Sequence, residues 1–201
     1  MSTLTMNISE KDLEKELTVG RKKSAKPMLW VSMISMVMFF AGLTSAYVIS
    51  MKRDDWVTFE LPNAFYISTL LIVLSSITIG VSQNLIKKGK RELSIVFLLI
   101  TFVLGVGFMW QQYAGFEQLR NAGLFFTGPS STVSTSFIIG ISLMHAFHVI
   151  AGILVLLVVI YNHFKYKYTS DDLLGFELGA IFWHFVDVLW IYLFFFFYFI
   201  R

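Results

Sequence analysis

Five long apolar segments constrain this chain more than any other feature of its sequence. They cover about residues 28–50, 63–86, 93–116, 133–161 and 176–200. Each is as long as the roughly 20 residues that an α-helix needs to cross the hydrocarbon core of a bilayer. The segments also lack the alternation of apolar and polar residues that marks the strands of a membrane β-barrel. We therefore predict an all-α fold, a polytopic membrane bundle of five transmembrane helices.

The composition and the positions of two prolines agree with this organisation. Of the 201 residues, 56% are hydrophobic and only 14% are charged, as is typical of a membrane protein. Pro27 and Pro62 come just before the first two segments, where proline favours the start of a helix. Residues 1–26 are polar, and we predict a cytoplasmic tail there, followed by a single membrane domain over residues 27–201.

The polar tail admits two interpretations. Ser9 and Asp12 have the spacing of a capping box, which predicts a short helix over about residues 9–18. A solvated tail that orders only against a partner fits the sequence equally well.

The distribution of basic residues predicts the orientation of the bundle. Six Lys and Arg precede the first segment, four follow the second and two follow the fourth, which places twelve on one side and leaves four for the other. Because the side richer in Lys and Arg faces the cytoplasm, the N-terminus should be cytoplasmic and the C-terminus periplasmic. The basic residues flank apolar segments and form no groove, so we predict no nucleic-acid partner. Six aromatic residues near the segment ends are expected to be interfacial anchors: Trp30, Tyr47, Tyr66, Trp110, Tyr113 and Tyr161.

Ionisable residues inside two of the segments are the candidate functional groups. The last segment contains Glu177, His184 and Asp187, and the fourth contains His145 and His148. An ionisable group in hydrocarbon is unstable by several kcal/mol, about 2.5 or more for a central Asp, and therefore needs partners. Helical periodicity places each set on one face of its helix, so two adjacent antiparallel helices can share one polar layer.

Three interpretations of this layer remain open. A network of hydrogen bonds between helices is the favoured one, because such bonding is the usual outlet for buried polar groups in membranes. The alternatives are a metal or haem site built from three imidazoles and a carboxylate, and a proton relay. Small residues at Gly175 and Gly179 would permit close helix packing in the first case.

Two lysines near the inner end of the fourth segment have a separate interpretation. Lys165 and Lys167 alternate with tyrosines in the segment HFKYKYTSDD. They are candidates for contacts with anionic lipid headgroups, at about 1 kcal/mol per charge. Ordinary basic flanking of a transmembrane helix explains them equally well.

Three motifs of the last two segments belong together: WHFVDVLW (183–190), GFELGA (175–180) and HAFHVIAG (145–152). They resemble subunit III of the haem-copper oxidases, the cytochrome c oxidase family, and the resemblance extends from about Trp30 to the C-terminus. Five helices resemble the short bacterial form, which lacks the two N-terminal helices of seven-helix members. The sequence has four His and no Cys, too few for the haem and copper centres of the catalytic subunit.

The resemblance implies a non-catalytic accessory subunit of a proton-pumping terminal oxidase in the bacterial cytoplasmic membrane. It implies that this subunit stabilises subunit I, sustains proton uptake and binds phospholipid, with haem and copper in partner subunits and contacts to subunit II and other subunits. The chain itself would contain no metal or redox cofactor. The residues His145, His148, Glu177, His184 and Asp187 would then serve helix packing.

The chain departs from the family pattern at two carboxylate positions, which Met36 and Gly115 occupy here. Glu117 lies two residues from the second of them. Both losses favour a scaffold role over direct proton handling. A quinol oxidase subunit III is the alternative within the family, and an autonomous membrane metalloenzyme and a small transporter are the alternatives outside it.

Overall fold

A computed structural model describes residues 10–54, 56–58, 61–128, 131–168 and 173–200. They form five helices: α1 (Glu10–Ser50), α2 (Asn63–Lys87), α3 (Arg91–Asn121), α4 (Val133–Phe164) and α5 (Leu174–Phe199). All five are long and apolar enough to cross a membrane, and the described residues contain no β-strand beyond one isolated bridge between Phe125 and Ser131. The prediction of an all-α bundle with five membrane helices is confirmed.

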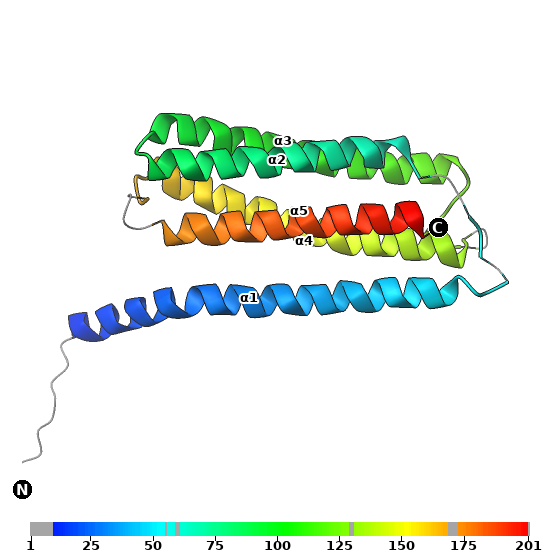
Figure 1. Cartoon of the computed structure of the whole chain (residues 1–201), viewed down its shortest axis with the longest axis horizontal. Helices are drawn as coiled ribbons and strands as arrows, with labels where there is room; N and C mark the ends of the chain where they lie inside the picture. The colour runs from blue at the N-terminus through cyan, green and yellow to red at the C-terminus, as the bar shows by residue number, and fades with distance from the viewer. Residues whose placement is uncertain (1–9, 55, 59–60, 129–130, 169–172, 201) are drawn as a thin grey trace, which may run out of the picture.

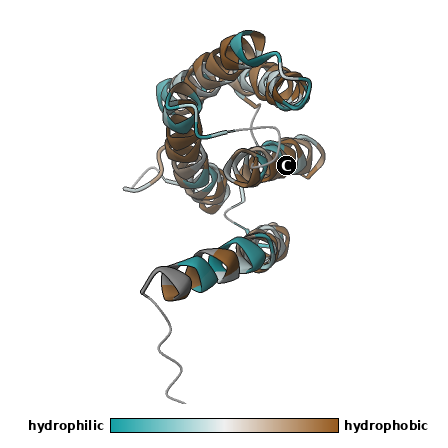
Figure 2. Cartoon of the chain, turned by 90° about the vertical axis from the view of Figure 1, so that its left-hand side faces the viewer, coloured by the Kyte–Doolittle hydropathy of each residue, from teal (hydrophilic) through white to brown (hydrophobic). Residues whose placement is uncertain are grey.

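Helices α2 to α5 form a ring, and α1 lies outside it. In the ring, α2 packs against α3 and α5, and α4 packs against α3 and α5. Helix α1 contacts only α4 and α5, and it lies along one side of the bundle in Figure 1. Hydrophobic residues predominate along the helices, and hydrophilic residues gather at the turns and in the first part of α1 (Figure 2). The ring therefore has its own interior, and α1 packs against the side of the ring that α4 and α5 form.

Helix α1 is longer than the sequence predicts, because Pro27 lies inside it and does not start it. Proline removes one hydrogen bond within a helix, here the bond to the carbonyl of Lys23. Pro27 is exposed, so that carbonyl can be solvated, which lowers the cost of continuing the helix. The 41 residues span about 60 Å, and α1 extends past the other helices at its N-terminal side (Figure 1).

The short helix predicted over residues 9–18 is present from residue 10 onward, as the first part of α1. Its predicted cap at Ser9 lies outside the described residues, as do residues 1–9 of the predicted tail. Helix α2 begins directly after Pro62, as predicted.

Two connections lie at one end of the bundle, the α2–α3 turn and the segment that follows α4. The α2–α3 turn contains Lys88 and Lys90, directly after Lys87 at the end of α2, and it reverses at Gly89, whose φ of 72° favours glycine. The exposed Lys165 and Lys167 follow α4 at the same end. We call this the basic end. At the opposite end, α4 starts after Thr132, whose hydroxyl accepts a hydrogen bond from the backbone N–H of Thr135 at 3.3 Å.

Of the six predicted interfacial aromatics, five are exposed and Tyr47 is not. Tyr47 is fully buried, with its ring 4.8 Å from Trp56 and 5.3 Å from Phe196 between centroids. Its expected role as an interfacial anchor is therefore wrong. It belongs to the contact between α1 and α5, because position in the sequence indicates depth along a helix but not which face the side chain occupies.

Candidate functional site

The indole of Trp183 joins all four helices of the ring. It projects from α5, and its N–H donates a hydrogen bond to the Ser75 hydroxyl of α2 at 3.0 Å. A Cβ placed on Gly105 of α3 would lie 2.7 Å from the ring, and one on Gly152 of α4 would lie 3.1 Å from it. The two glycines therefore leave the space that the fully buried ring occupies.

Trp190 repeats this arrangement two turns further along α5. Its N–H donates to the Thr69 hydroxyl of α2 at 3.0 Å. Its ring lies 5.3 Å from Phe108 of α3 and 5.2 Å from His145 of α4, between centroids. These tryptophan contacts were not predicted from the sequence, although tryptophans in one apolar segment and glycines in two others were a signal that could have indicated them.

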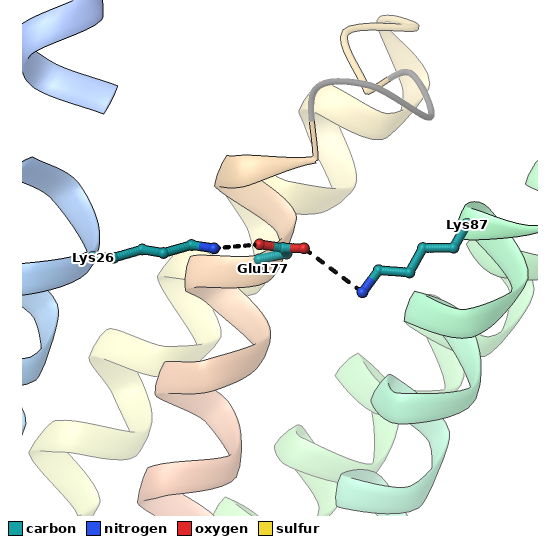
Figure 3. A network of polar contacts seen from close by, with 3 residues as sticks. All are labelled: Lys26, Lys87 and Glu177. Carbon is teal, nitrogen blue, oxygen red and sulfur yellow. Dashed lines mark hydrogen bonds and ion pairs between the residues drawn. The ribbon is translucent and has the colours of Figure 1, made fainter. Parts of the chain in front are cut away.

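Glu177 lies near the start of α5 and interacts with two other helices. Its carboxylate accepts a hydrogen bond from Lys26 of α1 at 2.8 Å and lies 3.6 Å from the ammonium of Lys87 of α2 (Figure 3). The Lys side chains are about half exposed (49% each), so the two pairs are partly screened by solvent. We call these three residues the Glu177 clasp, since they connect α1 and α2 through α5.

His184 and Asp187 also face α2. The Nδ1 atom of His184 lies 2.6 Å from the hydroxyl of Ser76. That hydroxyl also faces the buried carboxyl of Asp187. Neither carboxyl oxygen reaches hydrogen-bond geometry with a described group. The polar face of α5 is therefore directed at α2. The predicted polar layer shared by the fourth and fifth helices would require it to be directed at α4.

The two predicted imidazoles of α4 pack against aromatic rings. His145 is fully buried between Phe40 of α1, Phe108 of α3 and Trp190 of α5. His148 lies 5.6 Å from Phe40 between centroids, and its Nδ1 is 2.7 Å from the carbonyl of Met144. His145 connects helices through ring contacts rather than through hydrogen bonds to described groups.

The five predicted site residues thus fall into separate groups. Glu177 belongs to the clasp, His184 and Asp187 surround Ser76, and the imidazoles of α4 lie among rings. Across the described part of the chain, no three His, Asp or Glu side chains come together as metal ligands would. A ligand set of three imidazoles and a carboxylate needs all four at one point, and the described geometry does not bring them there.

The remaining predicted residues lie in two places. The Lys165 ammonium is 4.6 Å from the centre of the exposed Tyr161 ring, and Lys167 is exposed in the following turn. Met36 is half-buried on α1. Gly115 packs against α2 so closely that a Cβ there would lie 2.4 Å from the ring of Phe65.

The small residues predicted to permit close packing have different neighbours. A Cβ on Gly179 would lie 2.9 Å from Val159 of α4, so this glycine does lie at the α4–α5 contact. Gly175 instead faces Tyr168, in the segment that follows α4.

The sequence matches a family model described as "Cytochrome c oxidase subunit III" over residues 7–201. The chain belongs to this family. Cytochrome c oxidase subunit 3 of Neurospora crassa is 32% identical over 136 residues, which is 68% of this chain and 47% of that protein. Cytochrome bo(3) ubiquinol oxidase subunit 3 of Buchnera aphidicola is 30% identical over 172 residues, 83% of this chain and 88% of that protein. The corresponding protein of Pseudomonas aeruginosa is 28% identical over 170 residues, 82% of this chain and 79% of that protein.

The chain spans about half the length of the cytochrome c oxidase relatives that it matches and most of the length of the quinol oxidase ones. The family is an accessory subunit of haem-copper oxidases, which are multi-subunit enzymes of membranes. This chain is accordingly a multi-pass membrane protein. For a subunit III, the bonds of Glu177 and His184 to other helices are contacts that hold one subunit together.

Proposed function

We propose that this chain is the non-catalytic subunit III of a proton-pumping cytochrome c oxidase in a bacterial cytoplasmic membrane. The single observation that carries the proposal is the match to the subunit III family over residues 7–201. In this role the chain stabilises subunit I, contacts subunit II, binds phospholipid and sustains proton uptake, while haem and copper belong to the partners. The chain holds no metal or redox cofactor of its own.

The placement of the ionisable residues supports a scaffold role. Glu177 bonds to lysines of two helices, His184 bonds to Ser76, and His145 is enclosed by rings. Each of these groups joins helices of the chain to one another, which is what a rigid accessory subunit requires. The glycine at position 115, tightly covered by Phe65, also favours a scaffold, because a carboxylate cannot fit there without displacing that ring.

A quinol oxidase subunit III is the second candidate. It is favoured by the match to the bo(3) ubiquinol oxidase subunits, which covers 88% and 79% of their lengths. The two candidates differ in the electron donor, which binds to other subunits.

Purification of the tagged chain from native membranes in mild detergent tests both candidates. We expect a haem-containing subunit to copurify and the preparation to reduce oxygen with reduced cytochrome c as donor. Oxidation of a quinol instead, without oxidation of cytochrome c, would favour the second candidate. A tagged chain that carries stoichiometric haem, iron or zinc without any partner would contradict both.

A further inference from the structure

Helix α1 has a second face that the described part of the chain does not cover. Its inner face holds Met33, Phe40, Thr44 and Tyr47, which are buried where α1 meets α4 and α5. On a different side of the helix, uncharged residues recur at alternating intervals of four and three residues. They are Leu13, Leu17, Gly20, Ser24, Pro27, Val31, Ile34 and Met38, and all of them are exposed. We call these residues the α1 stripe.

The α1 stripe begins in the polar part of the helix. Leu13 and Leu17 are 48% and 57% exposed, and they lie where α1 extends past the other helices (Figure 1). Lipid tails cover exposed residues such as Val31 and Met38 in the apolar part of α1, but they do not reach this extension. Two leucines exposed to water on one side of a helix gain free energy when another apolar surface covers them.

The spacing of the stripe indicates that this surface is another helix. Alternating intervals of four and three residues define the a and d positions of a heptad repeat, which form the seam between two packed helices. A seven-residue period is slightly shorter than two turns of an α-helix, so two such helices wind around each other and keep the seam in contact. Gly20 and Ser24 lie within the stripe, and small residues there let two helix backbones approach closely.

The charges beside the stripe favour a second copy of this chain as the partner. With Leu17 at an a position, Glu16 occupies a g position and Arg21 the following e position. In a parallel pair of helices, a g residue of one faces the following e residue of the other, so Glu16 of each copy faces Arg21 of the other copy. Both side chains are exposed, and both line a groove of about 690 Å³ along the first part of α1.

The other basic residues of this region are compatible with the same pairing. Lys23, the next g position, faces Met28 of the other copy, so like charges do not meet there. Lys15 and Lys22 occupy f positions, which point away from the seam. Two copies that cross one membrane in the same sense have parallel α1 helices, which is the direction that the Glu16–Arg21 pairing requires.

We propose that two copies of this chain associate through the α1 stripe, as a parallel pair of α1 helices related by a two-fold axis. The same face serves both copies, so the Glu16–Arg21 pair forms twice. Each copy keeps its own contacts to α4 and α5, since those use the inner face of α1. This association goes beyond the proposed function, and it would join two complexes through their subunits III.

Disulfide crosslinking in native membranes tests the pairing. The chain has no cysteine, so Leu17→Cys places one thiol per chain at the seam. Val19→Cys is the matched control, because Val19 is also apolar and exposed but occupies a c position outside the seam. Two forms of the full chain with different tags are expressed together and oxidised. We expect a linked product that carries both tags with Leu17→Cys, and about tenfold less of it with Val19→Cys, because a disulfide forms only between closely apposed residues.

Reversal of the charges distinguishes a second copy from any other partner. In the Leu17→Cys chain, Glu16→Lys places like charges opposite each other and should lower the yield about tenfold, and Arg21→Glu should do the same. The two substitutions together restore opposite charges and should restore the yield. A double variant as weak as the single ones would overturn the proposal. So would equal yields from Leu17→Cys and Val19→Cys, or the absence of a two-tag product from Leu17→Cys, including its attachment to a different protein.

Discussion

The ring of Trp183 occupies space that two glycines leave open, so the neighbouring helices have little room for an added side-chain atom at either glycine. We predict that Gly105→Ala destabilises the subunit by about 1–3 kcal/mol, because its Cβ would lie 2.7 Å from the indole. Thermal unfolding of the purified complex, monitored by the release of subunit III, measures this loss of stability. Gly107→Ala on the same helix is the control, since its Cβ would meet Leu71 at an ordinary 3.6 Å. Equal loss in both variants would contradict the role of the indole.

Gly115 poses the same steric problem with Phe65, and a double-mutant cycle can isolate it. We predict that Gly115→Ala is costly in the natural background and costs less when Phe65→Leu is also present, with a coupling of about 0.5–3 kcal/mol. The physical reason is that the smaller side chain vacates the space a Cβ needs. The free energy of unfolding of the four proteins in the cycle is the measurement. Strict additivity of the two substitutions would show that the ring is not what excludes a side chain from position 115.

At the scale of elements, α1 is the helix least held by the rest of the molecule. It packs only on α4 and α5, and the Glu177 clasp joins it to α5 at the basic end. We predict that Glu177→Gln costs about 1 kcal/mol or less, since the lysines are half exposed, but speeds hydrogen exchange in α1 around Lys26. Exchange in α3 should be unchanged.

The matched control for the clasp is Glu117→Gln, which removes an exposed pair with Arg120 within α3. That pair spans 3.6 Å and connects no second helix, so we expect exchange in α1 to stay as it is. If both variants alter α1 equally, or neither does, the clasp does not hold α1 to the bundle.

The sequence predicts which helices this chain forms better than it predicts the residue at which each helix begins. The apolar segments give all five helices, because crossing hydrocarbon requires both length and satisfied backbone groups. The prediction from Pro27 is wrong because α1 continues through it. The residues before Pro27 are mostly polar and those after it are mostly apolar, and the free-energy cost of one lost hydrogen bond at an exposed position is too small to end the helix between them. The start of α2 after Pro62 is predicted correctly, because no helix precedes that proline directly.

At the scale of the whole molecule, the order of helices around the ring decides what each face meets. Periodicity correctly groups Glu177 and His184 on one face of α5, yet that face meets Lys87 and Ser76 of α2, which the sequence pattern did not indicate. The burial of Asp187 could be expected from its place in an apolar helix, whereas its neighbours could not. Local sequence contains the period of a helix but not the identity of the adjacent helix, so the residues of the site were predictable and their partners were not.

The orientation of the whole bundle is predicted from its basic end and can be tested directly. The chain has no cysteine, so a single introduced thiol reports one position without background. Lys88 lies in the α2–α3 turn and Arg120 at the opposite end of α3, and both are exposed. We predict that a membrane-impermeant maleimide labels Arg120→Cys and not Lys88→Cys in cells whose outer envelope is permeable to the reagent and whose cytoplasmic membrane is intact. Because Lys and Arg are retained on the cytoplasmic side, the lysine-rich turn should become reactive only after the membrane is opened. Labelling of Lys88→Cys in intact cells, with Arg120→Cys protected, would show that the topology is the reverse of the predicted one.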